Sequence, residues 1–198
     1  MPKQELTRVF NKILIQSKEY QEAITLLEKN HVGKTWIIGG FIYRNLASCL
    51  YGTRPVTSDM DFIVEQIPTK PSLPDSWNHT VNHFGNPKYS RDGLSLDVVP
   101  LTNIHSIRTN KLAPTIENYL LGVPLTIQSI AYDIETKEII GDVGITSLLQ
   151  KVVSVNNSEE LHYLAQKYKR SMNSYISEKA SSLCFTSKLI SSEPHTYL

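Results

Sequence analysis

The sequence lacks the features that mark secreted and membrane proteins. It has only two cysteines, Cys49 and Cys184, which are far apart and form neither a disulfide framework nor a set of zinc ligands. No apolar run approaches the roughly 18 residues of a membrane-spanning helix, and the first residues contain no apolar core of a secretion signal. We therefore expect a protein of the reducing cytoplasm, without a membrane partner.

An excess of charge of one sign is also missing. The chain has 20 lysines and arginines against 19 aspartates and glutamates, a net charge of +1. Such a protein produces no strong overall field that would attract nucleic acid, so an RNA partner would need a local basic patch. The phosphate-binding patterns of P-loop proteins and of Rossmann folds are absent, which leaves both fold classes without support. The oligomeric state is left open.

Two acidic residues stand two positions apart in the segment 59–64, which reads DMDFIV. Side chains alternate along a strand, so Asp59 and Asp61 project from one face while Met60 and Phe62 point to the other. Two carboxylates on one face can share a divalent cation, and Mg²⁺ usually combines one or two carboxylates with substrate phosphates. The pair therefore predicts a metal site that handles a nucleoside triphosphate.

A glycine pair, Gly39-Gly40, closes an apolar run ahead of these acids. Residues 34–38 have the composition of a short buried strand, and residues 41–51 have the apolar spacing of a helix. Glycines at this junction allow the backbone to approach a phosphate at the N-terminus of the helix. We therefore expect Gly39 and Gly40 to hold the triphosphate.

A third acid is expected on a neighbouring strand, because a two-metal mechanism needs a carboxylate near the attacking oxygen. Asp97 is the candidate. It lies in the segment 94–100, which reads LSLDVVP and has the alternation of a strand. A lone carboxylate in such an apolar segment is costly to bury unless it is paired or bound to a metal.

Each pattern has a simpler interpretation when taken alone. A glycine pair is often only a turn, and an acid-x-acid pair is often a solvated strand edge. His79 and His83 have a spacing that would suit zinc, but no further ligand joins them, which favours surface or stacking roles. The basic and aromatic run 167–170 is of the kind found in nucleic-acid grooves, although a solvated helix face explains it more simply. The order of the glycines and the three acids favours a nucleotide site.

Together these residues resemble the nucleotidyltransferase superfamily, which includes DNA polymerase beta, the head domains of tRNA CCA-adding enzymes, bacterial poly(A) polymerases and several stand-alone toxins and antitoxins. The resemblance is carried by Gly39-Gly40, Asp59-Met60-Asp61 and Asp97. Residues 125–152 also look like the strand, turn and helix that close the CCA-adding head domain. The resemblance covers roughly residues 34–155.

The resemblance implies a transferase that moves a nucleotidyl group from a triphosphate, ATP or CTP, to a hydroxyl and releases pyrophosphate. Asp59 and Asp61 would bind both Mg²⁺ (or Mn²⁺) ions, while Asp97 would bind one of them and orient or deprotonate the acceptor. An RNA 3′ end, as in tRNA, is favoured as the acceptor. A protein side chain, a small molecule, and a non-catalytic nucleotide-binding or antitoxin module stay open.

The chain departs from the CCA-adding pattern at its arginines. The segment 122–125, which reads GVPL, stands where those enzymes carry Arg-Arg-Asp, and the glycine pair stands further from the first acid. Phosphate contacts therefore cannot be transferred by position. Arg44, Arg54 and Lys88 are the candidates that the nearby sequence offers.

The implied fold is α/β of the α+β type, with a mixed, mostly antiparallel sheet and helices packed on one face. Residues 4–30 have helical spacing in two pieces that meet near Ser17, residues 77–84 predict a strand, and residues 159–180 predict one C-terminal helix. We expect a helical segment at 1–30, a nucleotidyltransferase domain at 31–155, and a helix with a loose tail at 156–198.

Overall fold

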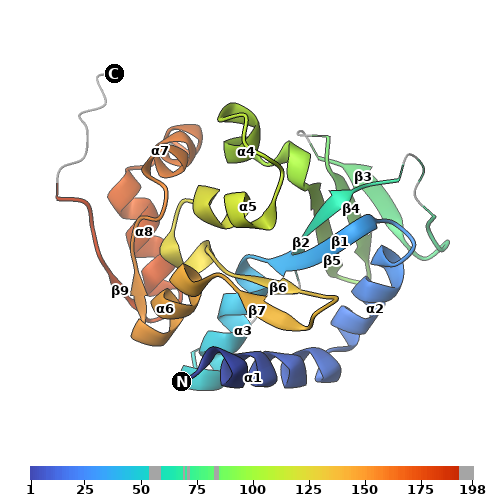
Figure 1. Cartoon of the computed structure of the whole chain (residues 1–198), viewed down its shortest axis with the longest axis horizontal. Coiled ribbons are helices and arrows are strands. Elements are labelled where there is room, and N and C mark those ends of the chain that lie inside the picture. Colours follow the sequence, from blue (N-terminus) through green and yellow to red (C-terminus); the bar gives the residue numbers. More distant parts are fainter. Residues whose placement is uncertain (54–58, 69, 71, 83–84, 192–198) are drawn as a thin grey trace.

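A seven-stranded sheet forms the centre of the molecule (Figure 1). The computed structural model describes residues 1–53, 59–68, 70, 72–82 and 85–191. The strand order is β3-β4-β5-β2-β1-β6-β7, and every neighbouring pair is antiparallel except β2 and β5. This confirms the mixed, mostly antiparallel sheet. The strands are β1 Val32–Ile38, β2 Asp59–Gln66, β3 Asn78–Val81, β4 Pro87–Arg91, β5 Leu94–Pro100, β6 Ala131–Asp133 and β7 Glu138–Ile140.

Three helices cover one face of this sheet: α1 Lys3–Gln16, α2 Lys18–Leu27 and α3 Gly40–Tyr51. Their apolar side chains share one core with alternate strand residues, such as Phe62 on β2 and Leu96 on β5. The break between α1 and α2 occurs at Ser17, as predicted, and the Ser17 hydroxyl accepts a hydrogen bond from the backbone N–H of Tyr20.

A smaller set of helices covers the opposite face. It consists of the 3₁₀ turn η1 Leu101–Asn103 and the helices α4 His105–Thr109 and α5 Ile116–Gly122. Ile63 of β2 packs there against this layer, together with Trp36 and Ile38 of β1. This second layer differs from the expectation of helices on one face only.

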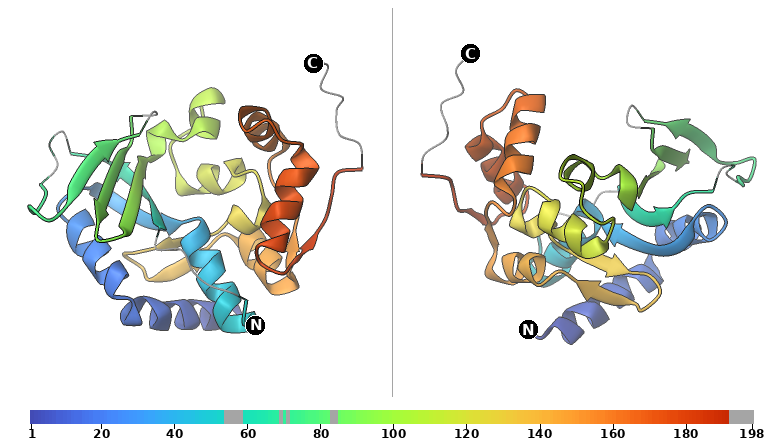
Figure 2. Two further views of the ribbon diagram at one scale, coloured as in Figure 1. Left: turned by 180° about the vertical axis from the view of Figure 1, so that it is seen from behind. Right: turned by 45° about the horizontal axis from the view of Figure 1, so that its top comes forward.

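The C-terminal third adds α6 Asp142–Gln150, α7 Ser158–Lys167 and α8 Met172–Ser181, with the turn η2 Thr126–Gln128 and the short strands β8 Val152–Val153 and β9 Thr186–Ser187. The prediction of one helix over 159–180 was wrong. The chain breaks at Lys169, which has a left-handed φ of 52°, and α8 starts afresh where the Ser171 hydroxyl accepts from the Ser174 N–H. Figure 2 shows α7 and α8 at one end of the molecule and the β3–β4 hairpin at the other.

The N-terminal and C-terminal helices pack into the same hydrophobic core as the sheet, called the main core below. Leu6 and Phe10 of α1 and Ile176 of α8 belong to the same buried cluster as the sheet. The division of the chain at residues 30 and 155 stays a prediction. No helix within the described ranges has both the length and the apolar character needed to cross a bilayer.

Candidate active site

The three predicted aspartates lie on two adjacent strands at the middle of the sheet. β2 and β5 run parallel, and their register sets Asp61 directly beside Asp97, with Asp59 beside Ser95. Met60 and Phe62 are buried in the main core, so Asp59 and Asp61 project from the opposite face, as the alternation predicts. Asp97 shares that face because its neighbours Leu96 and Val98 are in the main core.

The acids repel one another in a partly desolvated position. Burial raises the pKa of Asp61 to about 6, and the negative charges of Asp97 and then Asp59 contribute to the rise. The positive charges of Lys88 and Lys179 oppose it. A group of carboxylates that disfavours its own ionisation is stabilised by a bound cation, so the electrostatics of this site suit a metal ion.

Lys88 holds one of these carboxylates. It lies opposite Asp97 in the β4–β5 register, and its Nζ donates to Asp97 Oδ2 at 3.1 Å. Within the described part of the chain, no three His, Cys, Asp or Glu side chains are already gathered as a metal site. Asp59, Asp61 and Asp97 nevertheless offer the oxygen ligands that Mg²⁺ prefers. The residues therefore fit a magnesium ion in type, and Lys88 is bonded to one of the three carboxylates.

Gly39 brings the backbone against these acids. It follows β1, is the N-cap of α3 and has a positive φ of 71°. A Cβ atom there would lie 2.9 Å from Asp61 Oδ2. A side chain at this position would therefore collide with the carboxylate, in a backbone conformation that L-residues rarely adopt. α3 begins at the next residue, so its first turn, whose N–H groups have no partner within the helix, lies beside Asp61.

A cationic cavity of about 400 Å³ lies near the acids, between α3 and the α7–α8 region. Arg44 enters it from α3, and its Nε is buried without a hydrogen-bond partner among the described residues. Lys179 lines the cavity from α8 and donates from Nζ to the Tyr43 hydroxyl at 3.3 Å. The charge of Lys179 acts on the pKa of Asp61, which links the cavity to the aspartates. The cavity is completed by Tyr168, Arg170, Tyr175, Glu178 and Ser182.

The predicted phosphate contacts have different locations. Arg44 lies in the cationic cavity, Lys88 is paired with Asp97, and Arg54 falls outside the described residues. Lys179 and Arg170 were missed as site residues. The basic and aromatic run 167–170 was a signal for Arg170 only, and its simpler interpretation as a solvated helix face was preferred; no sequence pattern pointed to Lys179.

The last residues to place are Tyr119, near the acids, and the histidines His79 and His83. Tyr119 of α5 is buried, which raises the pKa of its phenol, and the charge of Asp61 adds to the rise, so this ring forms part of the wall near the acids. His79 is exposed and stacks on Tyr89 with ring centroids 5.3 Å apart, while His83 lies outside the described residues.

The fold is similar to that of part of solved CCA-adding and tRNA-processing enzymes. A solved complex of CCA-adding enzyme with CTP aligns with 96% of this chain, and the alignment covers 44% of that enzyme's chain. The TM-score is 0.55 and the sequence identity is 15%. A tRNA-processing enzyme with CTP matches 84% of this chain and 42% of its own, at a TM-score of 0.52 and 16% identity. A further complex of a tRNA-processing enzyme matches 78% of this chain and 40% of its own, at a TM-score of 0.50 and 18% identity.

These likenesses confirm the predicted fold, and at such identities they show the fold alone. The chain spans less than half the length of the solved structures it matches. No protein-family model and no curated protein matches the sequence.

Proposed function

We propose that the protein is a metal-dependent nucleotidyltransferase that moves a nucleoside monophosphate from a triphosphate to a hydroxyl group. The observation that carries the proposal is the placement of Asp59, Asp61 and Asp97 on one face of two adjacent strands, against Gly39. The fold likeness supports the same reaction class.

Each residue has a role in this proposal. Asp59, Asp61 and Asp97 would hold Mg²⁺ or Mn²⁺, which when bound stabilises negative charge on the phosphates. The N–H groups at the start of α3, which Gly39 leaves open, donate to the triphosphate. Asp97 would accept the proton of the attacking hydroxyl; its partial exposure, 29%, and its position beside Asp61 support this role.

The cationic cavity is the proposed place of the nucleotide. Arg44 and Lys179 offer positive charge for phosphate oxygens, and the rings of Tyr168 and Tyr175 offer surfaces on which a base can stack. ATP and CTP are the proposed substrates. Two of the structures with this fold are described as complexes with CTP.

An RNA 3′ end of the tRNA type is the proposed acceptor, because the structures with this fold are described as CCA-adding and tRNA-processing enzymes. A protein hydroxyl, as for toxin-like enzymes, is the alternative acceptor. Labelled product on a protein band in place of RNA would select it.

A second function has one specific observation in its favour. Lys88 forms an ion pair with Asp97, a carboxylate that the proposed reaction requires. A carboxylate held in this way would suit a nucleotide-binding module or an antitoxin without catalysis. This module would bind ATP or CTP in the cationic cavity and transfer nothing.

The test is transfer of radioactive label from each α-labelled triphosphate, with Mg²⁺ or Mn²⁺, to bulk tRNA or to a cell lysate. The control is the Asp59→Ala/Asp61→Ala variant, checked for folding by circular dichroism. Label on RNA or protein that disappears in the variant is the expected result. Nucleotide binding without transfer under any of these conditions would overturn the proposal of a transferase and favour the binding module.

A further inference from the structure

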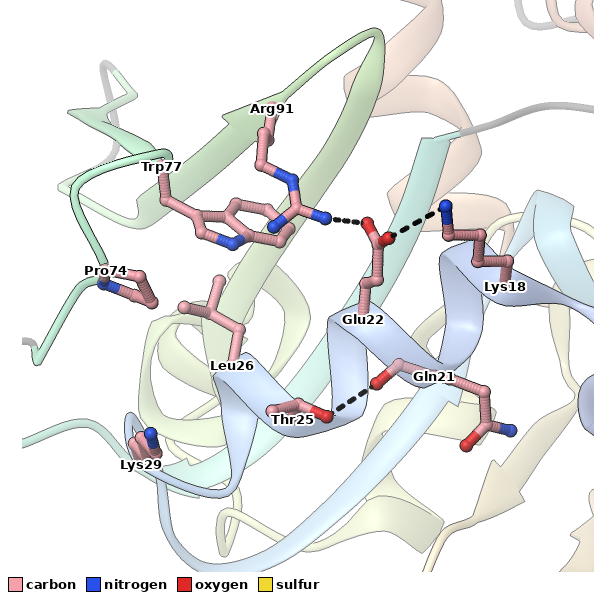
Figure 3. A pocket seen from close by; sticks show the side chains of 9 residues that line it. All are labelled: Lys18, Gln21, Glu22, Thr25, Leu26, Lys29, Pro74, Trp77 and Arg91. Atoms are coloured by element: carbon pink, nitrogen blue, oxygen red, sulfur yellow. Dashed lines mark hydrogen bonds and ion pairs between the residues drawn. The ribbon is translucent and has the colours of Figure 1, made fainter.

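Two cavities lie on different sides of α2. In the one drawn in Figure 3, next to Trp77, the charges are satisfied within the protein: Glu22 is bonded to Arg91, and Lys18 approaches it with Nζ 3.9 Å from Oε1. The other cavity, of about 500 Å³, lies between α2, the start of β1 and the turn after β6. Its lining contains acids and a hydroxyl that are not satisfied in this way.

The hydroxyl belongs to Thr35 of β1, which lines this cavity. Thr35 is only 5% exposed, and its Oγ1 atom is buried without a hydrogen-bond partner among the described residues. Strand alternation places the side chain on the same face of β1 as Ile37, which is buried in the main core. The hydroxyl therefore projects on the face of the sheet that α2 covers. A buried polar group without a partner is costly, so a ligand that supplies one would be stabilised there.

Three glutamates give the lining a negative charge. Glu28 comes from the end of α2, Glu65 from β2 and Glu135 from the turn after β6, while Lys34 is the one lysine or arginine among the described lining residues. Three negative charges against one positive charge leave −2 when His31 is neutral. In the part of the chain that the structure describes, the carboxylates of Glu28 and Glu135 form no hydrogen bond or ion pair. The lining therefore favours a cation.

The Glu65 carboxylate is held in place by the backbone of β1. Its Oε2 accepts from the backbone N–H of Lys34 at 3.1 Å. It also occupies the space beside Gly33, where an added Cβ would lie 2.0 Å from Oε2, at the point where the register of β1 against β2 shifts. The absent side chain at Gly33 therefore lets this carboxylate sit against the strand, and Oε1 is left for another donor.

The remaining walls are apolar, with one further acceptor. Ile24 and Leu27 of α2 and Ile134 after β6 line the cavity. His31 Nδ1 donates to the Leu27 carbonyl, so Nε2 of the neutral ring is an acceptor. Among the described residues, no three His, Cys, Asp or Glu side chains are gathered as a metal site. A cation with an apolar body therefore fits this lining better than a metal ion does.

We propose that this cavity binds a small aliphatic amine in its ammonium form. An ammonium group has three N–H donors, which match the Thr35 hydroxyl and the carboxylates of Glu65 and Glu135. The alkyl chain packs against Ile24 and Leu27. The aspartates of the candidate active site project from the opposite face of the sheet, so the amine site is independent of the proposed transferase activity.

Butylamine, the neutral analogue 1-butanol and the anion butyrate are the test ligands, added to the full chain in an amine-free buffer and followed by calorimetry. All three carry the same short alkyl chain and differ in the charge of the polar end. We expect butylamine to bind about tenfold more tightly than 1-butanol, because its hydrogen bonds are charge-assisted, and butyrate to bind least.

Three variants, each checked for folding by circular dichroism, locate the ammonium group. Thr35→Val removes the hydroxyl at nearly constant volume and should weaken butylamine binding about tenfold. Glu135→Gln should weaken it about threefold, a smaller effect because the carboxylate is exposed. Glu138→Gln makes the same change at an exposed glutamate of β7 outside the lining and should leave the affinity unchanged.

Three results would each overturn the proposal. They are equal affinity for butylamine and 1-butanol, full affinity for butylamine in Thr35→Val, and equal effects of Glu135→Gln and Glu138→Gln. The comparison of the two glutamate variants does not depend on the folding of Thr35→Val, because neither changes a buried residue.

Discussion

Lys88 and Asp97 face each other across β4 and β5, joined by a 3.1 Å bond between ammonium and carboxylate. In the proposed function, a metal ion and this lysine would compete for the carboxylate of Asp97. If the proposal holds, that competition affects how tightly the aspartates bind metal.

Replacing Lys88 by methionine should increase metal affinity. The change frees Asp97 and removes a positive charge close to the acids. Because Lys88 is 42% exposed, we expect a gain of up to about fivefold in the affinity for Mn²⁺, measured by calorimetry. Lys12→Met is the control for general loss of charge. An unchanged affinity would show that Asp97 is not a ligand.

Asp61→Asn should stabilise the protein at neutral pH in metal-free buffer. The folded-state pKa of Asp61, about 6, is above the ordinary value near 3.9 of an unfolded chain, so ionisation disfavours the folded state. The wild-type protein therefore loses stability as the pH rises from about 4 to about 6. Above pH 6 the variant should be more stable by about 1–2 kcal/mol in urea unfolding, an amount reduced for partial exposure.

Two further conditions test that result. Below pH 4 both forms carry an uncharged group at residue 61, so the difference should vanish. Mg²⁺ should stabilise the wild type and leave Asp61→Asn unaffected. A stability gap that is constant from pH 4 to pH 8 would contradict the assignment of the raised pKa to Asp61.

Gly39→Ala should disrupt the site beyond its effect on the backbone. Gly52 provides a control for a positive φ, because its φ is 65° and nothing lies within 4 Å of an added Cβ, but its ψ is 20° whereas that of Gly39 is −146°. Gly52→Ala should cost about 1 kcal/mol from the backbone conformation alone. Gly39→Ala should cost more and should abolish transfer, because its methyl group meets Asp61 Oδ2. Equal losses of stability and equal activities would show that the close approach is unimportant.

Lys179→Met should raise the KM for the nucleotide about tenfold, through the loss of a charge-assisted contact with phosphate. Lys188, an exposed residue beyond α8, supplies the control variant Lys188→Met. Steady-state kinetics with labelled CTP and ATP measure the effect. A fall in kcat with an unchanged KM would place Lys179 away from the bound nucleotide.

The strand positions and the main core could be predicted from the sequence because local alternation determines them. The segments 59–64 and 94–100 each show which side chains are buried, and the structure agrees at Met60, Phe62, Leu96 and Val98. The pairing of Asp61 directly beside Asp97 could not be predicted in this way, because the register between two strands depends on the whole sheet.

The cationic cavity was harder to predict because its residues come from distant parts of the chain. Arg44 and Lys179 are brought together by the packing of α3 and α8, and no local pattern encodes that contact. The break at Lys169 was missed for a related reason: neither proline nor glycine marks it, and its left-handed φ occurs at a lysine.

The parallel pairing of β2 with β5 also determines when the site can form during folding. Parallel neighbours cannot be joined by a tight turn, so the chain must leave the end of β2, form the β3–β4 hairpin and return to begin β5. Asp61 and Asp97 therefore meet only through long-range closure, a slow kind of folding event. A chain emerging from the ribosome cannot bring Asp61 and Asp97 together, and so cannot form the proposed metal site, until β5 has been synthesised.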